Sequence, residues 1–445
     1  MTVIEINDAA LKVRQREVVL ADSPAFVHLG RRETLIGPDA RAFIKRDPTR
    51  MEHEFWHRFG RDELRRRYKA ARYQADLAFL HLEDLWQRAG RPAGPVTFAL
   101  PGDFRGEQVA LLLGMAARLQ MDVSAVVDLA VAGLARPRPG RRLMHLDLHL
   151  HRAVLTSLSQ GESLAHERSW SSPEVGLMRV LDAWADTVAR LFVASARFDP
   201  MHDAEVEQRL YDQLASWGAA LATADAVAIS LEDQGRRFEA ELGRSAIVEA
   251  AAPVYRRLGA FLAEALDENA PTTLSVTHRA GQLPGLVEAL GEIPELEVVV
   301  LPESAVGVGL EELPLPDAGE DGGVPWVRSK PWLARSEHSA HASAVDGYSR
   351  RRPTHWLAAG IARPIGPSLA LRADGAPAGN PGEAAVMIHA GADGAVQVEA
   401  AAGTALAVNG RPHPGELRKV NAGDRLRIDA SGLDVTLIAV EHDGA

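Results

Sequence analysis

The amino-acid sequence predicts a mixed α/β region followed by a small all-β domain. Strands alternate with helices as far as residue 312, which is typical of an α/β domain. Residues 313–353 are rich in Pro, Gly, Ser, His and charged residues without a sustained period, which predicts a linker. From residue 354 to 445, short apolar runs alternate with Gly, Pro and Asp turns, which predicts a small all-β sandwich or barrel.

The first half of the α/β region contains five short apolar runs bounded by turn residues. We expect strands at Val3–Ile6, Val18–Ala21, Ala25–Leu29, Glu33–Ile36 and Val96–Leu100. Residues 51–90 are charged and rich in Leu and Ala, which predicts helix. An amphipathic helix is expected over Gly106–Gln120, where Val109, Leu112, Leu113, Ala116 and Ala117 share one face.

The second half repeats this alternation. Leu143–Leu150 and Arg152–Ser159 are expected to pair as a hairpin, and residues 173–221 are mostly helical in pattern. A second hairpin is expected around Asp233-Gln234-Gly235. Beyond it the sequence predicts a helix to Leu266, a strand at Thr273–Thr277, a helix to Leu290 and a strand at Glu297–Val300.

Composition excludes several functional classes. The net charge of −11 argues against general binding to nucleic acid or to anionic membranes, which need a basic surface. The chain has no cysteine, which excludes disulfides, thiolate nucleophiles and cysteine-ligated metals. No apolar stretch is long enough to span a bilayer, and residues 1–8 do not resemble a signal peptide. We therefore expect a cytoplasmic protein with no nucleic-acid partner and no membrane insertion.

Five short motifs occur in order along residues 1–312. They are Ile36-Gly37-Pro38-Asp39-Ala40, Leu100-Pro101-Gly102-Asp103-Phe104, Val127–Ala135, Gly281–Pro284 and Pro302–Gly309. Together they resemble the ATPase domain of seventy-kilodalton heat-shock chaperones in the actin superfamily. The resemblance implies a two-lobed actin-like ATPase fold, with lobe I over about residues 1–140 and lobe II over about residues 141–312. In that family, ATP and Mg²⁺ bind in the cleft between the lobes.

The positions that hold ATP in that family depart from its pattern here. The phosphate loops "DLGTT" and "DLGGGT" read Glu5-Ile6-Asn7-Asp8-Ala9 and Asp147-Leu148-His149-Leu150-His151-Arg152, so glycines that let backbone approach phosphate are lost. Trp56 or His57 stands at the lysine position, and the adenosine motif "GGSxRxP" begins His278-Arg279. The resemblance thus implies a degenerate cleft with the carboxylates Glu5, Asp8, Asp128 and Asp147. Its vestigial nucleotide positions are Asn7, His149, His151, Arg152, His278, Arg279 and Gly281.

Three histidines and a carboxylate alternate along one predicted strand: His145, Asp147, His149 and His151. On a regular strand they would share a face and offer a metal donor set. The family's hairpin turns near His149–His151, however, which breaks the alternation. We therefore expect no metal, and we expect the imidazoles to fill the vacated phosphate cleft. If ATP and Mg²⁺ do bind, then His149, Arg152 and Arg279 are the cationic groups available to phosphate.

The C-terminal region resembles the forkhead-associated sandwich. Gly403-Thr404, Val408-Asn409-Gly410, Leu417 and Ala422–Ile428 match turns of that family. The family's phosphothreonine-reading residues do not carry over, because no "SRxH" segment exists and Ala402 stands where the binding asparagine would be. The resemblance implies a protein-interaction module. Trp326, Trp332 and Trp356 punctuate the linker and its end, and we expect them to dock on a domain or a partner.

The sequence leads to one main functional hypothesis and two alternatives. We expect a non-catalytic, chaperone-like scaffold or assembly factor that contacts protein partners through the β domain and the linker. One alternative is a divergent ATP-dependent chaperone that retains nucleotide binding. The other is an actin-like ATPase that forms polymers.

Overall fold

The computed structural model divides the chain into two units by contacts, Met1–Trp332 and Leu333–Ala445. It describes residues 1–66, 68–134, 137–266, 270–311, 313, 315–316, 323–331, 353–358, 361–365, 368–372, 384–390, 396–401, 404, 406–408, 411–413, 418–420, 425–428 and 433–438. The first unit is mixed α/β and the second is all-β, as the sequence predicts. No helix in these described residues is long and apolar enough to cross a membrane.

The first unit contains two six-stranded sheets. The first sheet has the order β16-β8-β7-β1-β2-β3. Its strands are β1 (Thr2–Glu5), β2 (Leu11–Gln15), β3 (Val18–Ser23), β7 (Val96–Leu100), β8 (Val123–Asp128) and β16 (Trp326–Val327). Strands β1, β2 and β3 pair antiparallel, whereas β7 pairs parallel to β1, β8 parallel to β7, and β16 parallel to β8.

The second sheet has the order β15-β14-β9-β10-β11-β17. Its strands are β9 (Arg142–Leu148), β10 (Ala153–Gln160), β11 (Ser163–Ser172), β14 (Thr272–Val276), β15 (Leu296–Val300) and β17 (Ser329–Pro331). Strands β9, β10 and β11 pair antiparallel, as β1, β2 and β3 do. On the opposite side of β9, β14 pairs parallel to β9, and β15 pairs parallel to β14. Five strands of each sheet therefore repeat one topology, in which β1 and β9 are equivalent, whereas β16 and β17 extend opposite edges.

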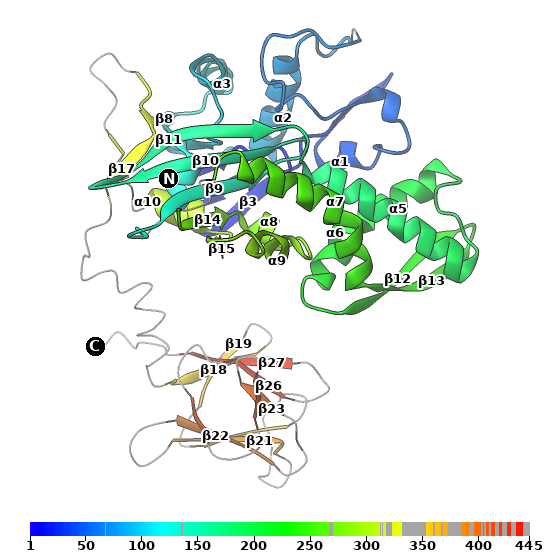
Figure 1. Ribbon diagram of the computed structural model, residues 1–445, viewed down its shortest axis with the longest axis vertical. Helices are drawn as coiled ribbons and strands as arrows, with labels where there is room; N and C mark the ends of the chain where they lie inside the picture. The colour runs from blue at the N-terminus through cyan, green and yellow to red at the C-terminus, as the bar shows by residue number, and fades with distance from the viewer. Residues whose placement is uncertain are drawn as a thin grey trace. The chain divides into compact units, whose positions relative to one another are not determined.

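Helices and small hairpins complete the first unit (Figure 1). The helices are α1 (Pro38–Arg41), η1 (Pro48–Arg50), α2 (Gln74–Arg88), α3 (Gly106–Arg118), α4 (Leu129–Gly133), α5 (Leu177–Ala196), α6 (Ala204–Leu221), α7 (Arg244–Ala263), α8 (His278–Gly281), α9 (Leu286–Gly291) and α10 (Ala305–Glu311). The small sheets are β12 (Ala226–Asp233) with β13 (Arg236–Gly243), and β4 (Val27–Leu29) with β5 (Thr34–Ile36) and β6 (Met51–Glu52). Gln234 and Gly235 take positive φ in the β12–β13 turn, which suits a tight hairpin.

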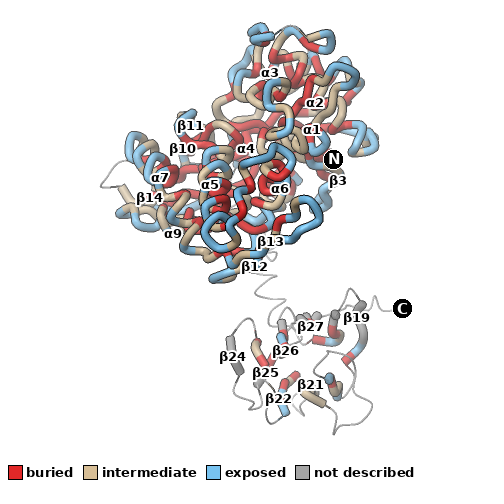
Figure 2. Tube along the Cα trace, turned by 90° about the vertical axis from the view of Figure 1, so that its right-hand side faces the viewer, coloured by how far each residue is buried: buried red, intermediate tan, exposed pale blue. Residues whose placement is uncertain are grey.

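Each sheet has its own apolar core. Figure 2 shows the buried residues of the first unit in red. Ile4, Phe98 and Leu82 belong to the first core, and Leu146 and Trp184 belong to the second. All five residues of β7 are buried, because helices and loops cover both faces of a parallel strand. The central strands are thereby fixed in position, and so are the loops that leave their carboxyl ends.

The second unit contains two antiparallel sheets that share one buried core. The sheet orders are β19-β18-β27-β26-β23-β24 and β20-β21-β22-β25. The strands are β18 (His355–Ala358), β19 (Ile361–Pro364), β20 (Ser368–Leu371), β21 (Val386–Ala390), β22 (Val396–Ala400), β23 (Leu406–Val408), β24 (Arg411–His413), β25 (Arg418–Val420), β26 (Arg425–Ile428) and β27 (Leu433–Ile438). Several residues that carry the forkhead-associated resemblance lie outside the described residues, namely Gly403, Asn409, Gly410, Leu417 and Ala422–Asp424, and so does Ala402.

Two sequence-based expectations are wrong. Among the described residues of the range 51–90, the helix covers Gln74–Arg88 alone. The Asp76 carboxylate accepts hydrogen bonds from the backbone N–H groups of Arg72 and Tyr73, which fixes the helix start at that point. The predicted linker also contains β16 and β17, which pair with the edge strands β8 and β11. Trp326 thus docks on the first unit, whereas Trp356 is buried in the core of the second. Trp332 lies outside the described residues.

The crossing of α4 and α10 gives a test of the fold. A Cβ added at Gly309 of α10 would lie 1.8 Å from the carbonyl oxygen of Ala132. We expect Gly309→Ala to lower the free energy of unfolding by about 1–3 kcal/mol, because backbone must move to relieve the overlap. Gly259→Ala in α7 is the matched control, since its Cβ would meet no atom within 4 Å. It should raise stability by about 0.5–1 kcal/mol. Urea unfolding measures both, and equal effects would contradict this packing.

Candidate functional site

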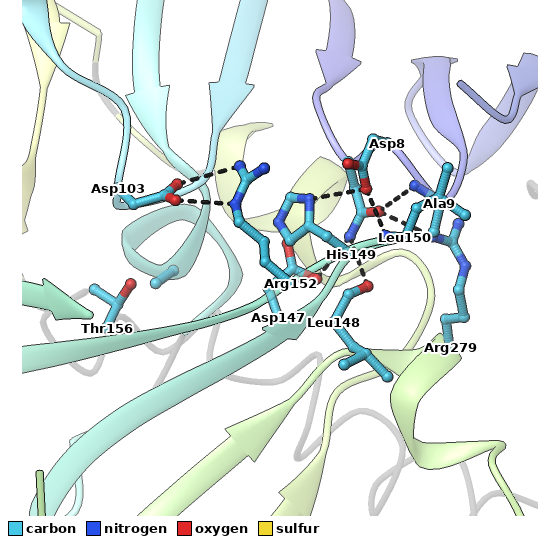
Figure 3. A network of polar contacts seen from close by, with 12 residues as sticks. Asp8, Ala9, Asp103, Asp147, Leu148, His149, Leu150, Arg152, Thr156 and Arg279 are labelled. Carbon is cyan, nitrogen blue, oxygen red and sulfur yellow. Dashed lines mark hydrogen bonds and ion pairs between the residues drawn. The ribbon is translucent and has the colours of Figure 1, made fainter. Parts of the chain in front are cut away.

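Two loops meet where the equivalent strands β1 and β9 end (Figure 3). The first loop carries Asn7 and Asp8, and the second is the turn of residues 149–152. The Asn7 side chain donates a hydrogen bond of 2.8 Å from Nδ2 to Oδ1 of Asp147. In return, the backbone N–H of Leu150 donates to Oδ1 of Asp8 at 2.6 Å. Each sheet therefore supplies a carboxylate that accepts a hydrogen bond from the other.

His149 lies between these two carboxylates. Its Nδ1 is 3.3 Å from Oδ1 of Asp8, and its Nε2 is 3.2 Å from Oδ2 of Asp147. All three residues are buried. Burial and nearby Arg152 disfavour a charged imidazole, but the two carboxylates outweigh them and raise the pKa of His149 to about 9. Although burial opposes it, His149 also holds the pKa of Asp8 and that of Asp147 below their usual range.

Arg279 adds a second cation to this network. It is in α8, and its Nη1 donates to Oδ1 of Asn7 at 3.2 Å. The same oxygen accepts a hydrogen bond of 2.9 Å from the backbone N–H of Ala9. The side chain of Asn7 therefore joins the first loop, Arg279 and Asp147. We call Asn7, Asp8, Asp147, His149 and Arg279 the cleft network.

Arg152 and His151 link the same turn to the first sheet's half of the unit. Arg152 Nε donates to Oδ2 of Asp103 at 3.0 Å, and its Nη1 is 3.5 Å from Nδ1 of His57. His151 Nε2 lies 2.8 Å from Nδ1 of His53, and the two rings stack. Burial and nearby His151 lower the pKa of His53 to about 4, so this pair is neutral at neutral pH.

The remaining predicted cleft residues have other contacts. Glu5 forms an ion pair of 2.6 Å with Arg14, and burial raises the pKa of Glu5. Asp128 is the N-cap of α4 and accepts hydrogen bonds from the N–H groups of Ala130 and Val131. Its other oxygen is 2.7 Å from Nδ1 of His166.

The adenosine-motif positions also differ in role. His278 Nε2 lies 2.7 Å from the side-chain nitrogen of Gln282, outside the cleft network. A Cβ added at Gly281 would lie 2.4 Å from a methyl group of Val300, so this glycine allows α8 to pack on β15. Of the two residues at the lysine position, Trp56 is buried and donates to His81 at 3.0 Å, and His57 faces Arg152.

No group of three or more histidine or acidic side chains in the described residues is arranged to hold a metal ion. The side chains of His145, Asp147, His149 and His151 do not share one face, because β9 ends at Leu148 and the last two residues lie in the turn. His145 lies 3.0 Å from Oγ of Ser275, and His149 and His151 are in the turn with separate partners.

The space beside the cleft network is small. A cavity of about 60 Å³ borders Asn7, Asp147 and Arg279. A cavity of about 240 Å³ lies beyond Leu150 and Arg279, and most of its lining residues are apolar. Ligand pockets usually measure about 300–1,000 Å³, and neither cavity reaches that range.

No protein-family model matches this chain, and no curated protein matches it. The functional argument therefore rests on the geometry of the cleft network and its surroundings. Sequence reasoning missed Asp103 and His53 as partners of the turn. Asp103 carried a weak signal, because it directly follows the Pro-Gly that ends a buried strand, whereas His53 carried none.

Replacement of His149 tests the charge balance. We expect His149→Gln to lower the free energy of unfolding by about 3–5 kcal/mol at neutral pH, because two buried carboxylates lose their cation. His278→Gln is the matched control and should change stability by less than about 0.5 kcal/mol. Urea unfolding measures both variants. A small effect of His149→Gln, similar to that of the control, would contradict the ion pairs.

The stability of the protein should also fall as pH rises through about 9. The pKa of His149 is about 9 in the folded protein and about 6.5 for an unperturbed imidazole. Its stabilising contribution is therefore fully present below pH of about 6.5 and is lost progressively up to about 9. We expect a loss of about 3 kcal/mol across this window, measured by urea unfolding. The variant His149→Gln should show no such loss, and equal pH profiles would contradict the assignment.

Proposed function

We propose that the first unit is a heat-shock-chaperone-like, two-lobed domain of the actin type whose nucleotide cleft is closed by its own side chains. The repeated strand order of the two sheets supports this fold. So does the position of the cleft network, because Asn7-Asp8 and residues 149–152 follow the equivalent strands β1 and β9. These are the positions where the resemblance places the two phosphate loops.

One observation carries the proposal: side chains accept the hydrogen bonds that the loops would offer to phosphate. The Leu150 N–H donates to Asp8, and the Ala9 N–H donates to Asn7. The carboxylate of Asp8 is thus an internal anion at the mouth of the second loop. A phosphate group would have to displace it and would meet the negative charges of Asp8 and Asp147.

The magnitude of this loss is large. Hydrogen bonds to charged groups contribute about 1.5–3 kcal/mol each, so the two N–H donors of Leu150 and Ala9 would contribute about 3–6 kcal/mol. Because each 1.4 kcal/mol is about tenfold in affinity, a site of about 1 μM would weaken to about 0.1–10 mM from this loss alone, before the repulsion from the two carboxylates. Nucleotide binding at this site is therefore not part of the proposed function.

In this proposal the chain is a non-catalytic scaffold or assembly factor that acts through protein contacts. The first unit is a platform that needs no ligand to hold its two sheets together. The second unit, with two antiparallel sheets around one core, supports a forkhead-associated-like interaction module. We propose that partners bind this module and the linker before it.

Thermal unfolding with nucleotide tests the closed cleft. A ligand at about 100 times its Kd stabilises the folded state by about 2.7 kcal/mol, which raises the melting temperature. We expect millimolar Mg-ATP to leave the melting temperature unchanged within error. A rise in melting temperature that Asp147→Ala abolishes would contradict the proposal. Phosphate release by the wild type with the same sensitivity would instead support a divergent ATP-dependent chaperone.

A further inference from the structure

A broad groove lies between α2 and α3, away from the cleft network. Its volume is about 1320 Å³, and the segments 57–62 and 68–72 close its remaining side. Figures 1 and 2 place α2 and α3 at one end of the first unit and the β12–β13 hairpin at the other. The groove shares no lining residue with either of the small cavities at the cleft.

The two helices give the groove apolar walls. Phe79 and Leu80 line it from α2, and Leu111 and Met115 line it from α3. Gly114 lies between the last two on the same wall and is exposed. A Cβ added at Gly114 would meet no atom within 4 Å, so the backbone of α3 is open to close approach there.

The rim of the groove is positive although the chain is acidic. Six basic and three acidic side chains line it, whereas the whole chain has a net charge of −11. The basic residues are Arg58, Arg61, Lys69, Arg72, Arg105 and Arg118. Two of the three acidic residues are engaged locally, since Asp76 caps α2 and Glu107 pairs with Arg105. Arg61, Lys69 and Arg118 have no carboxylate within ion-pair distance among the described residues.

We propose that this groove binds an acidic amphipathic helix of a partner protein. Two helices with apolar inner faces form a channel of the kind that accepts a third helix, whose apolar residues recur every three or four positions. Acidic residues flanking that stripe would meet Arg61, Lys69 and Arg118 on the rim. The gap at Gly114 would allow the partner helix to approach closely.

The groove is less suited to single-stranded nucleic acid. Such strands bind by stacking their bases on exposed aromatic faces beside a basic track. The phenyl and phenol rings that line the groove are those of Phe59, which is buried, Tyr68, whose hydroxyl donates to Glu52, and Phe79, whose ring the guanidinium of Arg118 covers at 5.1 Å. This inference rests on the proposed scaffold function and adds the class of partner. Its test measures peptide binding, whereas the closed cleft is tested with nucleotide, so the failure of one can be told from the failure of the other.

Selection from a peptide library tests the inference with the full-length protein. Random peptides of about four helical turns are displayed on phage and selected, and the enriched sequence is synthesised with a fluorescent label. We expect enriched sequences with apolar residues at i, i+3, i+4 and i+7 and a majority of Asp and Glu elsewhere. Fluorescence anisotropy then measures Kd for the wild type and for groove variants.

The variants separate groove binding from general charge effects. Gly114→Leu should weaken binding at least about tenfold by filling the gap, and it should fold, because leucine is a better helix former than glycine. Lys69→Glu with Arg118→Glu should weaken binding by a similar factor, more strongly at low salt. Arg256→Glu on α7, also exposed, is the matched control and should leave Kd unchanged.

Three outcomes would overturn the inference. They are the absence of any enriched peptide, enrichment of basic or unpatterned sequences, and equal binding of the selected peptide by the wild type and Gly114→Leu. Displacement of the bound peptide by a single-stranded oligonucleotide would also count against it, provided that the same oligonucleotide concentration displaces the peptide equally from the Arg256→Glu control. That result would indicate a nucleic-acid site instead.

Discussion

The buried arrangement of Asp8, His149 and Asp147 is the constraint on which the architecture of the first unit depends. Two carboxylates are removed from water at the point where the sheets meet, and buried charges are tolerated only when they are paired. His149 supplies the shared cation, with ion-pair distances of 3.3 and 3.2 Å. Because one carboxylate comes from each sheet, the charge balance also fixes the distance between the sheets.

Under the proposed function, this ion-paired arrangement holds the two sheets together, as a bound nucleotide would otherwise do. The hydrogen bonds from Leu150 to Asp8 and from Asn7 to Asp147 close the gap without a ligand. Arg152 with Asp103 and His151 with His53 add contacts from the same turn to the first sheet's half. The result is a platform whose shape does not vary with nucleotide state. Function would then reside on its surfaces, including the groove between α2 and α3.

Much of this fold could be predicted from the sequence, because local patterns determine it. The hairpin that turns at residues 149–152 follows from the alternation of the two strands beside it, and the Gln234-Gly235 turn follows from its turn residues. The helix predicted over residues 51–72 is absent even though Phe55, Trp56 and Phe59 have helical spacing, and these three side chains are instead buried in the first core from a turn. Strands β16 and β17 have two and three residues, too few to show a period, and depend on edges of distant strands. Cross-sheet partners such as Asn7 and Asp147 are 140 residues apart, so no local signal pairs them.

The protonation state of His149 tests the central claim most directly. Nitrogen-15 NMR of labelled histidine distinguishes an imidazolium from a neutral ring, and a His149→Gln sample assigns the signal. The account predicts that His149 is still protonated on both nitrogens at pH of about 8, below its pKa of about 9. It also predicts that millimolar Mg-ATP leaves the signal unchanged. A titration midpoint at or below about 6.5, or a shift of the signal on adding Mg-ATP, would contradict the closed, charge-balanced cleft.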